Sequence, residues 1–152
     1  MVRLTDVEPE LRQFLEDYEC PDINTFAWQT GPALADRRVA LISSAGLRRR
    51  GDKAFSVHAN DYRIIPVEKR NELVQDHVSS DHDRTGYQQD LNIIFPLDRL
   101  AELAVSGEIG SVADYHYSFM GATNPKEMRP AINQLAGVLK ADGVDAVVFC
   151  PV

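Results

Sequence analysis

The sequence predicts an α/β fold with an open, mostly parallel sheet and flanking helices, in a three-layer, Rossmann-like arrangement. Residues 38–44 form a short, nearly continuous apolar run that ends in a polar, glycine-containing segment. This pattern is typical of a strand buried on both faces of a parallel sheet. Residues 112–150 then change from strand to helix to strand character, as in a βαβ unit. No covering element follows the last strand, so the fold is expected to be incomplete at the C-terminus.

A capping-box pattern near the start of the chain predicts an amphipathic helix over residues 5–19. Thr5 is the expected N-cap, and Glu8 follows three residues later. Leu11 and Phe14 share one face of this helix with Leu15.

The next stretch, residues 20–37, contains two prolines and a glycine without a clear period. It is predicted to be irregular, wrapping over the domain or reaching to a partner chain. We therefore divide the chain into an N-terminal helix and irregular arm, residues 1–36, and an α/β domain, residues 37–152.

Between the first strand and the βαβ unit the pattern is weaker. Residues 46–61 are expected to form a charged loop, and residues 62–65 a short strand stopped by Pro66. Residues 68–91 are polar, and a helix is predicted over residues 96–106.

The βαβ unit itself is predicted in three parts. Residues 112–119 alternate as a strand, and Asn124 is a helix-start signal. Because proline breaks the ladder inside a helix, the regular helix is expected to begin at Pro130. Residues 144–150 return as a buried strand.

Composition places the chain among soluble globular domains. Hydrophobic residues make up 44% and charged residues 26% of its 152 residues, close to globular averages. Its apolar runs fall far short of the roughly 20 residues of a membrane-spanning helix, and no apolar signal segment is present. A cytoplasmic protein with no membrane partner is expected. The net charge of −7 argues against nucleic acid as a partner, because phosphate binding rests on clustered cations.

Cofactor motifs are absent from the sequence. It contains neither the GxGxxG nor the GxxxxGK[ST] phosphate-binding pattern, and no GxSxG nucleophile elbow. Its two cysteines, Cys20 and Cys150, form no CxxC and no zinc-finger spacing. No cofactor and no metal are predicted. Cys150, at the end of the last strand, is either a buried hydrophobe or a reactive group.

Two polar clusters leave alternatives open. The run Arg48-Arg49-Arg50 is either a solvated loop or a clamp for an anion or carboxylate. The segment 76–92 is a structural loop, a substrate-binding or acid/base site, or a metal site. Its best acid/base candidate is His77, because imidazole titrates near physiological pH. As a loop histidine, His77 is expected to fill no core volume.

Several passages, taken in order, resemble one known family. They are VALISSAGL (39–47) and RRGD (49–52); DYR (61–63), HVS (77–79), DLN (90–92) and FPLDRL (95–100); and residues 107–110, 117–121 and 142–147. Together they resemble the selenoprotein B family of glycine, sarcosine, betaine and D-proline reductases, over about residues 37–150 of the chain.

This resemblance implies reductive cleavage of a C–N bond in a small amine or imino acid, within a multisubunit complex. The family's redox residue is a selenocysteine or cysteine in a U/CxxC-type motif just after the strand matching residues 144–149. It acts as the anion, which is the nucleophilic form. Here the sequence reads Cys150-Pro151-Val152 and has no second cysteine nearby. The thiol or selenol chemistry is therefore expected from outside this chain.

The predicted function is thus the substrate-binding domain of such a reductase, with a small amine or amino-acid-like substrate. If complete, it would be an oxidoreductase that acts on X–H and Y–H to form X–Y, and the sequence leaves open whether this chain is itself an enzyme. The expected catalytic residues are His77 and Asp90. The expected substrate-binding residues are Ser44, Gly46, Arg63 and Asn92.

Two rival functions stay open. One is a non-catalytic binding or assembly subunit. The other is a metal-dependent enzyme using His77, His82 and Asp83. In either case a partner subunit or a homo-oligomer is expected, because the uncovered apolar strand at residues 144–150 invites pairing with another chain.

Overall fold

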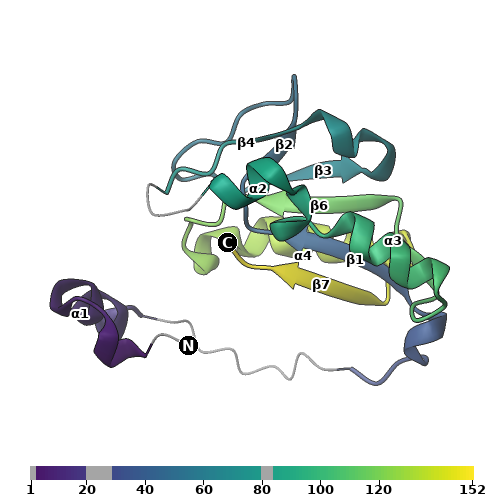
Figure 1. The fold of residues 1–152 in the computed structure, drawn as a ribbon, viewed down its shortest axis with the longest axis horizontal. Helices are drawn as coiled ribbons and strands as arrows, with labels where there is room; N and C mark the ends of the chain where they lie inside the picture. Colours follow the sequence, from purple (N-terminus) through teal and green to yellow (C-terminus); the bar gives the residue numbers. More distant parts are fainter. Residues whose placement is uncertain (1–2, 20–28, 80–83) are drawn as a thin grey trace.

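The computed structural model describes residues 3–19, 29–79 and 84–152. In its main sheet, β3 pairs with β6 and β6 with β1, while β5 and β7 also pair with β1 (Figure 1). The strands are β1 (Arg38–Ser43), β3 (Tyr62–Pro66), β5 (Ser111–Val112), β6 (Tyr115–Phe119) and β7 (Ala146–Cys150). β1 pairs in parallel with β5, β6 and β7, and β3 joins β6 antiparallel. The predicted open, mostly parallel sheet is confirmed.

Helices cover both faces of this sheet (Figure 1). On one face lies α4 (Pro125–Ala141). On the other lie α3 (Leu97–Val105), the short α2 (Thr85–Gln89) and the 3₁₀ turn η4 (Leu91–Ile93). Among the described residues, no helix is long and apolar enough to cross a membrane.

Side chains of the central strand β1 alternate between two hydrophobic cores, one on each face of the sheet. Val39 and Leu41 pack in a cluster with the α3 side, and Ile42 packs with Tyr117 and with Leu135 of α4. Successive side chains of a strand point to opposite faces, so one strand can serve both layers. Burial of β1 on both faces is what its apolar run predicted.

The predicted strand 112–119 is divided into β5 and β6. At the break, the ring Nδ1 of His116 accepts the Leu41 N–H of β1 at 3.0 Å. Burial lowers the pKa of His116 to about 4, so the ring is neutral and Nδ1 is free to accept. A histidine side chain thus replaces a backbone partner in the ladder.

A second, two-stranded sheet was not predicted. It pairs β2 (Leu47–Arg49) antiparallel with β4 (Leu73–Gln75), and the turn η3 (Val67–Glu72) precedes β4. Each strand has three residues, too few to show a period of two in the sequence. Leu47 joins this sheet to the main one by donating its N–H to Ser118 Oγ at 2.9 Å.

Helix α4 begins earlier than expected. The regular helix was predicted from Pro130, but it starts at Pro125, with the Asn124 side chain accepting the Lys126 N–H at 2.9 Å. Pro130 lies inside the helix and lacks the N–H that would reach the Lys126 carbonyl. The helix continues because Leu135 and its neighbours pack on the sheet.

The N-terminal arm also differs from the prediction. Its elements are the turn η1 (Leu4–Asp6), helix α1 (Pro9–Asp17) and the turn η2 (Leu34–Asp36). The helix begins at Pro9 rather than at Thr5, since proline fits the first helical turn. Figure 1 shows α1 standing apart from the sheet, and none of its residues is buried. Residues 20–28 of the predicted irregular stretch lie outside the described residues.

Candidate functional site

The ends of β4, β6 and β7 meet at the carboxyl end of β1. The Ser44 N–H donates to the Cys150 carbonyl at 3.0 Å, and the Gly46 N–H donates to the Phe119 carbonyl at 2.8 Å. The Gly46 carbonyl accepts the Asp76 N–H at 2.9 Å. This turn is thereby fixed at the edge where open α/β sheets bind ligands.

The two serines of this turn have different surroundings. Ser43 is fully buried, and its hydroxyl donates to the Ile94 carbonyl at 2.8 Å. Ser44 lies at the edge, where its hydroxyl accepts the Val152 N–H at 2.8 Å. Ser43 therefore ties β1 to the segment after η4, whereas Ser44 ties the turn after β1 to the residues that follow β7.

His77 packs directly against the turn. A Cβ atom on Gly46 would lie 2.9 Å from the His77 backbone nitrogen. A Cβ atom on Gly121 would lie 3.1 Å from His77 Nε2 and would clash with the backbone carbonyl oxygen of Ser44. Both glycines have positive φ, 65° and 88°, which glycine adopts without strain. Of the predicted site residues, the structure thus brings together Ser44, Gly46 and His77.

The His77 ring is held by its own loop. Nδ1 accepts the Ser79 N–H at 3.2 Å, and Arg84 donates to the His77 carbonyl at 2.7 Å. In the neutral ring this leaves the proton on Nε2, the nitrogen near Gly121. The residue is only 7% exposed. The expectation that it fills no core volume is therefore wrong, because the loop folds it under the sheet edge.

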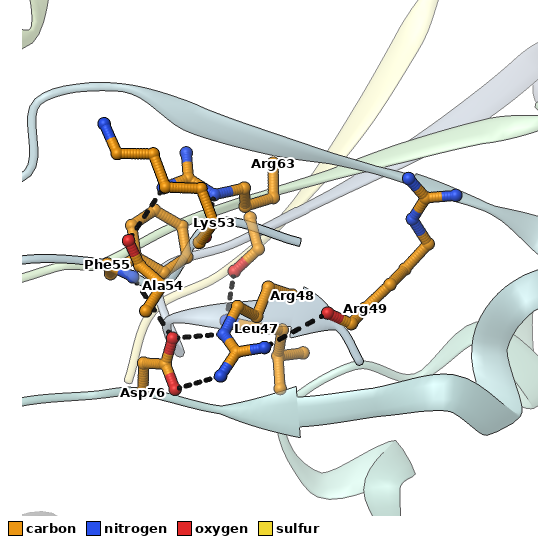
Figure 2. Close-up of polar contacts among 9 residues, drawn as sticks. Leu47, Arg48, Arg49, Lys53, Ala54, Phe55, Arg63 and Asp76 are labelled. Atoms are coloured by element: carbon orange, nitrogen blue, oxygen red, sulfur yellow. Dashed lines mark hydrogen bonds and ion pairs between the residues drawn. The ribbon is translucent and has the colours of Figure 1, made fainter. Parts of the chain in front are cut away.

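An ion pair fixes the backbone next to His77. The Arg48 guanidinium on β2 donates through Nε and Nη2 to the two carboxylate oxygens of Asp76 (Figure 2). The hydrogen bond to Asp76 raises the pKa of Arg48. Asp76 also accepts the Phe55 N–H at 3.1 Å. The first arginine of the basic run is thus committed to this pair and is not a solvated loop residue.

Arg63, expected to bind substrate, contacts its own chain. Its guanidinium donates to the carbonyls of Lys53, Tyr62 and Ala54 at 2.9–3.3 Å and forms an ion pair with Asp61 at 3.0 Å. It also lies 4.2 Å from the centre of the Phe55 ring (Figure 2). These contacts use most of the donors of a guanidinium and hold the 53–61 loop.

Asp90 and Asn92 form a cap at the start of η4. The Asp90 carboxylate accepts the Asn92 N–H and the Asn92 side-chain NH₂, both at 2.9 Å. These bonds, the backbone one first, lower the pKa of Asp90. Asn92 also reaches Asp98, accepting its N–H at 3.1 Å. These hydrogen bonds are local, and the predicted catalytic role of Asp90 and binding role of Asn92 stay predictions.

Cys150 ends β7 beside the same edge. Burial raises the pKa of its thiol, so the protonated form is favoured at neutral pH. On the α4 side of the edge a groove of about 450 Å³ opens between α4 and β7, with walls that are almost entirely apolar. Ser44 and Cys150 stand at one end of this groove.

The described residues contain no group of three or more histidine, cysteine, aspartate or glutamate side chains that could hold a metal ion. His82 and Asp83, which the metal hypothesis requires, lie outside the described residues. That hypothesis therefore stays a prediction.

Sequence reasoning missed Gly121, and it named Arg48 only as part of a possible clamp for an anion or carboxylate, without its partner Asp76. A signal for Gly121 was present, since a glycine directly after a strand indicates a positive φ or a close approach. Nothing in the sequence identified Asp76 as the partner of Arg48, because β2 and β4 are far apart along the chain and too short to be recognised.

The chain is thus an open α/β domain with a serine, a histidine and a thiol near the carboxyl end of its central strand. The glycine/sarcosine/betaine reductase selenoprotein B family matches residues 10–151, and the chain belongs to this family.

Curated relatives agree with this assignment. D-proline reductase subunit gamma of Acetoanaerobium sticklandii is 32% identical over 120 residues, covering 76% of this chain. Glycine reductase complex component B subunit gamma of Carboxydothermus hydrogenoformans is 30% identical over 127 residues, covering 78%. Sarcosine reductase complex component B subunit beta of Peptoclostridium acidaminophilum is 29% identical over 127 residues, covering 78%. The chain spans 49% of the length of the first relative and 29% of each of the others. No solved structure matches it.

Proposed function

We propose that this chain forms the substrate-binding part of a reductase that cleaves the C–N bond of a small amine or imino acid. The thiol or selenol chemistry is supplied from outside these residues. Family membership supports the reaction class, and the relatives are named as reductase subunits for D-proline, glycine and sarcosine. The observation that carries the proposal is the packing of His77 against Gly46 and Gly121, the glycines of the turns at the ends of β1 and β6.

The chemistry of the reaction explains why a histidine is needed there. Reductive cleavage leaves the bonding electrons on nitrogen, so the departing amine must gain a proton. The Nε2–H of His77 can donate that proton, or hold a substrate carboxylate, and imidazole changes its charge near neutral pH. The backbone N–H groups of the glycine turn offer further donors for a carboxylate. Asp90, whose low pKa keeps it ionised, is suited to pairing with a substrate ammonium.

The test replaces His77 in the full-length protein within its complex. His77→Asn keeps an acceptor for the Ser79 N–H but removes the second ring nitrogen. We expect it to lower kcat by about 10²–10⁴, the usual contribution of general acid/base catalysis. The matched control is His58→Ala, because His58 is exposed and lies outside this edge. Reduction of glycine, sarcosine, betaine and D-proline with dithiothreitol is the assay.

Two results separate the proposal from its alternatives. Full activity in a folded His77→Asn protein would remove His77 from the mechanism. Loss of folding in His77→Ala, with His77→Asn folded and active, would mean that the ring only fills space.

The assembly-subunit function has support of its own. Arg63, Asp90 and Asn92 are engaged in local contacts, and a wide apolar groove lies open beside α4. Under this alternative the chain would bind none of the four substrates. Isothermal titration of each substrate into the full-length protein distinguishes the two functions.

A further inference from the structure

The two-stranded sheet of β2 and β4 ends directly before His77. Its last pair joins Leu47 to Gln75, and Asp76 is the first residue beyond β4. The Asp76 N–H donates to the Gly46 carbonyl at 2.9 Å, so the pairing continues as far as the turn after β1. The position of the His77 backbone therefore depends on how Asp76 is held.

Three donors converge on the Asp76 carboxylate. Two come from the Arg48 guanidinium, which bonds to both carboxylate oxygens, and the third is the Phe55 N–H (Figure 2). The side chains of Arg48 and Asp76 are 20% and 18% exposed, so salt screens this pair much less than an exposed one. A bidentate contact between a guanidinium and a carboxylate fixes direction as well as distance.

The loss of Arg48 would disturb the backbone at His77. Of the described donors to the Asp76 carboxylate, only the Phe55 N–H would remain. A mostly buried carboxylate without its cation is costly, and a turn of the Asp76 side chain toward water relieves this cost. Because Asp76 and His77 are consecutive, such a turn would shift His77 away from the glycines against which it packs.

The hydrogen bonds of His77 within its own loop have a different effect. The Ser79 N–H donates to the ring Nδ1, and Arg84 donates to the His77 carbonyl. These bonds orient the ring inside the loop. The pair of Arg48 and Asp76 instead ties the loop to β2, which belongs to the folded body of the chain.

We propose that Arg48 is a positioning residue that acts through Asp76 and holds the His77 ring in its place at the carboxyl edge of the main sheet. The consequence for activity rests on the function proposed for His77. Arg48 needs no contact with the substrate, because its effect passes through Asp76. The next arginine, Arg49, differs in this respect, since it donates to Asp52 in the turn after β2.

The experiment uses the full-length protein within its complex and reduction of the four substrates with dithiothreitol. Arg48→Ala should lower kcat, as His77→Asn does, by about 10²-fold, the usual cost of misplacing a reacting group by about 1 Å. Arg48→Lys keeps the charge but not the planar fork, so its loss should be smaller. Arg49→Ala is the matched control and should keep kcat within about twofold, because it breaks a more exposed ion pair.

A double-mutant cycle tests whether Arg48 acts through His77. In a His77→Asn background, Arg48→Ala should lower kcat no further, because the group that it positions is absent. An equal additional loss in that background overturns the inference, and so does a wild-type kcat in a folded Arg48→Ala protein. If Arg48→Ala does not fold, Arg48→Lys takes its place in the cycle.

Hydrogen exchange separates this inference from the function proposed for His77. The amides of residues 76–79 should exchange faster in Arg48→Ala than in the wild type and should be unchanged in Arg49→Ala, because only the first variant loosens the loop. Faster exchange together with full activity in His77→Asn would support the positioning and reject only the catalytic function of His77. Unchanged exchange at these amides in Arg48→Ala overturns the positioning itself.

Discussion

Two histidines near β6 illustrate how burial sets the role of one residue type. The His116 ring lies inside the sheet, where burial lowers its pKa to about 4 and its Nδ1 replaces a backbone acceptor for Leu41. The His77 ring lies at the sheet edge, where its Nε2 packs against Gly121. The first is therefore a structural residue, and the second is the candidate for chemistry.

We predict that His116 makes the fold sensitive to mild acid. Its ordinary pKa of 6.5 falls to about 4 in the folded chain, so between these values the unfolded chain binds more protons than the folded one. Stability then rises with pH over this window and is lost as pH falls from about 6.5 to 4. The loss from this residue is about 3 kcal/mol. Urea unfolding at several pH values measures it.

The control for this prediction is His116→Asn. Asparagine can still accept the Leu41 N–H but does not titrate, so the variant should be less stable at neutral pH and have a flatter pH dependence. If both proteins lose the same stability between pH 6.5 and pH 4, carboxylates and not His116 are responsible.

At the same scale, the site could be predicted in part. Ser44 and Gly46 were chosen because they follow a buried strand, where open α/β sheets bind ligands, and His77 because imidazole titrates near physiological pH; the structure brings the three close together. The sequence could not show that Arg63 differs from these residues. An arginine that donates to carbonyls of its own loop, as Arg63 does, cannot be distinguished by sequence from one that binds a substrate carboxylate.

Among the elements, the turn at the end of β6 packs closely against the turn at the end of β1. We predict that Gly121→Ala is much more destabilising than Gly51→Ala. Both glycines have positive φ, 88° and 96°, so each substitution incurs backbone strain of about 1–3 kcal/mol. Only at Gly121 would the new Cβ also meet a backbone oxygen, that of Ser44, at 2.4 Å.

Thermal unfolding of the two variants measures this difference. We expect the loss of unfolding free energy to be larger for Gly121→Ala than for Gly51→Ala by about 2 kcal/mol or more, because overpacking that shifts the backbone usually costs this much. Equal losses of unfolding free energy in the two variants would mean that the turn after β6 can move away from Ser44. The packing of Gly121 against His77 would then not be fixed.

The strength of each sequence signal decided which elements could be predicted. The continuous apolar run of β1 was confirmed as a strand buried on both faces. The strand–helix–strand pattern ending in β7 was also confirmed. β7 was predicted to be buried, but none of its residues is buried here, and Phe149 is 72% exposed. The short β2 and β4 were missed, since pairing across the fold creates them. α4 was predicted to start at Pro130, but packing on the sheet outweighs the proline penalty there.

At the scale of the whole molecule, the thiols available at the carboxyl edge limit the redox chemistry that the described residues can perform. The carboxyl edge carries one thiol, Cys150, which is partly buried and whose pKa burial raises. A two-thiol cycle needs a second cysteine close by, and the other cysteine of the sequence, Cys20, lies outside the described residues. The relatives are substantially longer than this chain, which is consistent with redox groups elsewhere in the full protein or its complex.

We therefore predict that these 152 residues alone do not reduce glycine, sarcosine, betaine or D-proline with dithiothreitol, although they carry the proposed substrate edge.

In the full-length protein within its complex, Cys150→Ser should keep activity within about twofold, because a protonated, partly buried thiol is a poor nucleophile. Amine release from each substrate measures both outcomes. Turnover by the 152-residue chain that disappears in Cys150→Ser would assign the chemistry to Cys150. Loss of activity in full-length Cys150→Ser, with the fold intact by circular dichroism, would make this thiol part of the redox cycle.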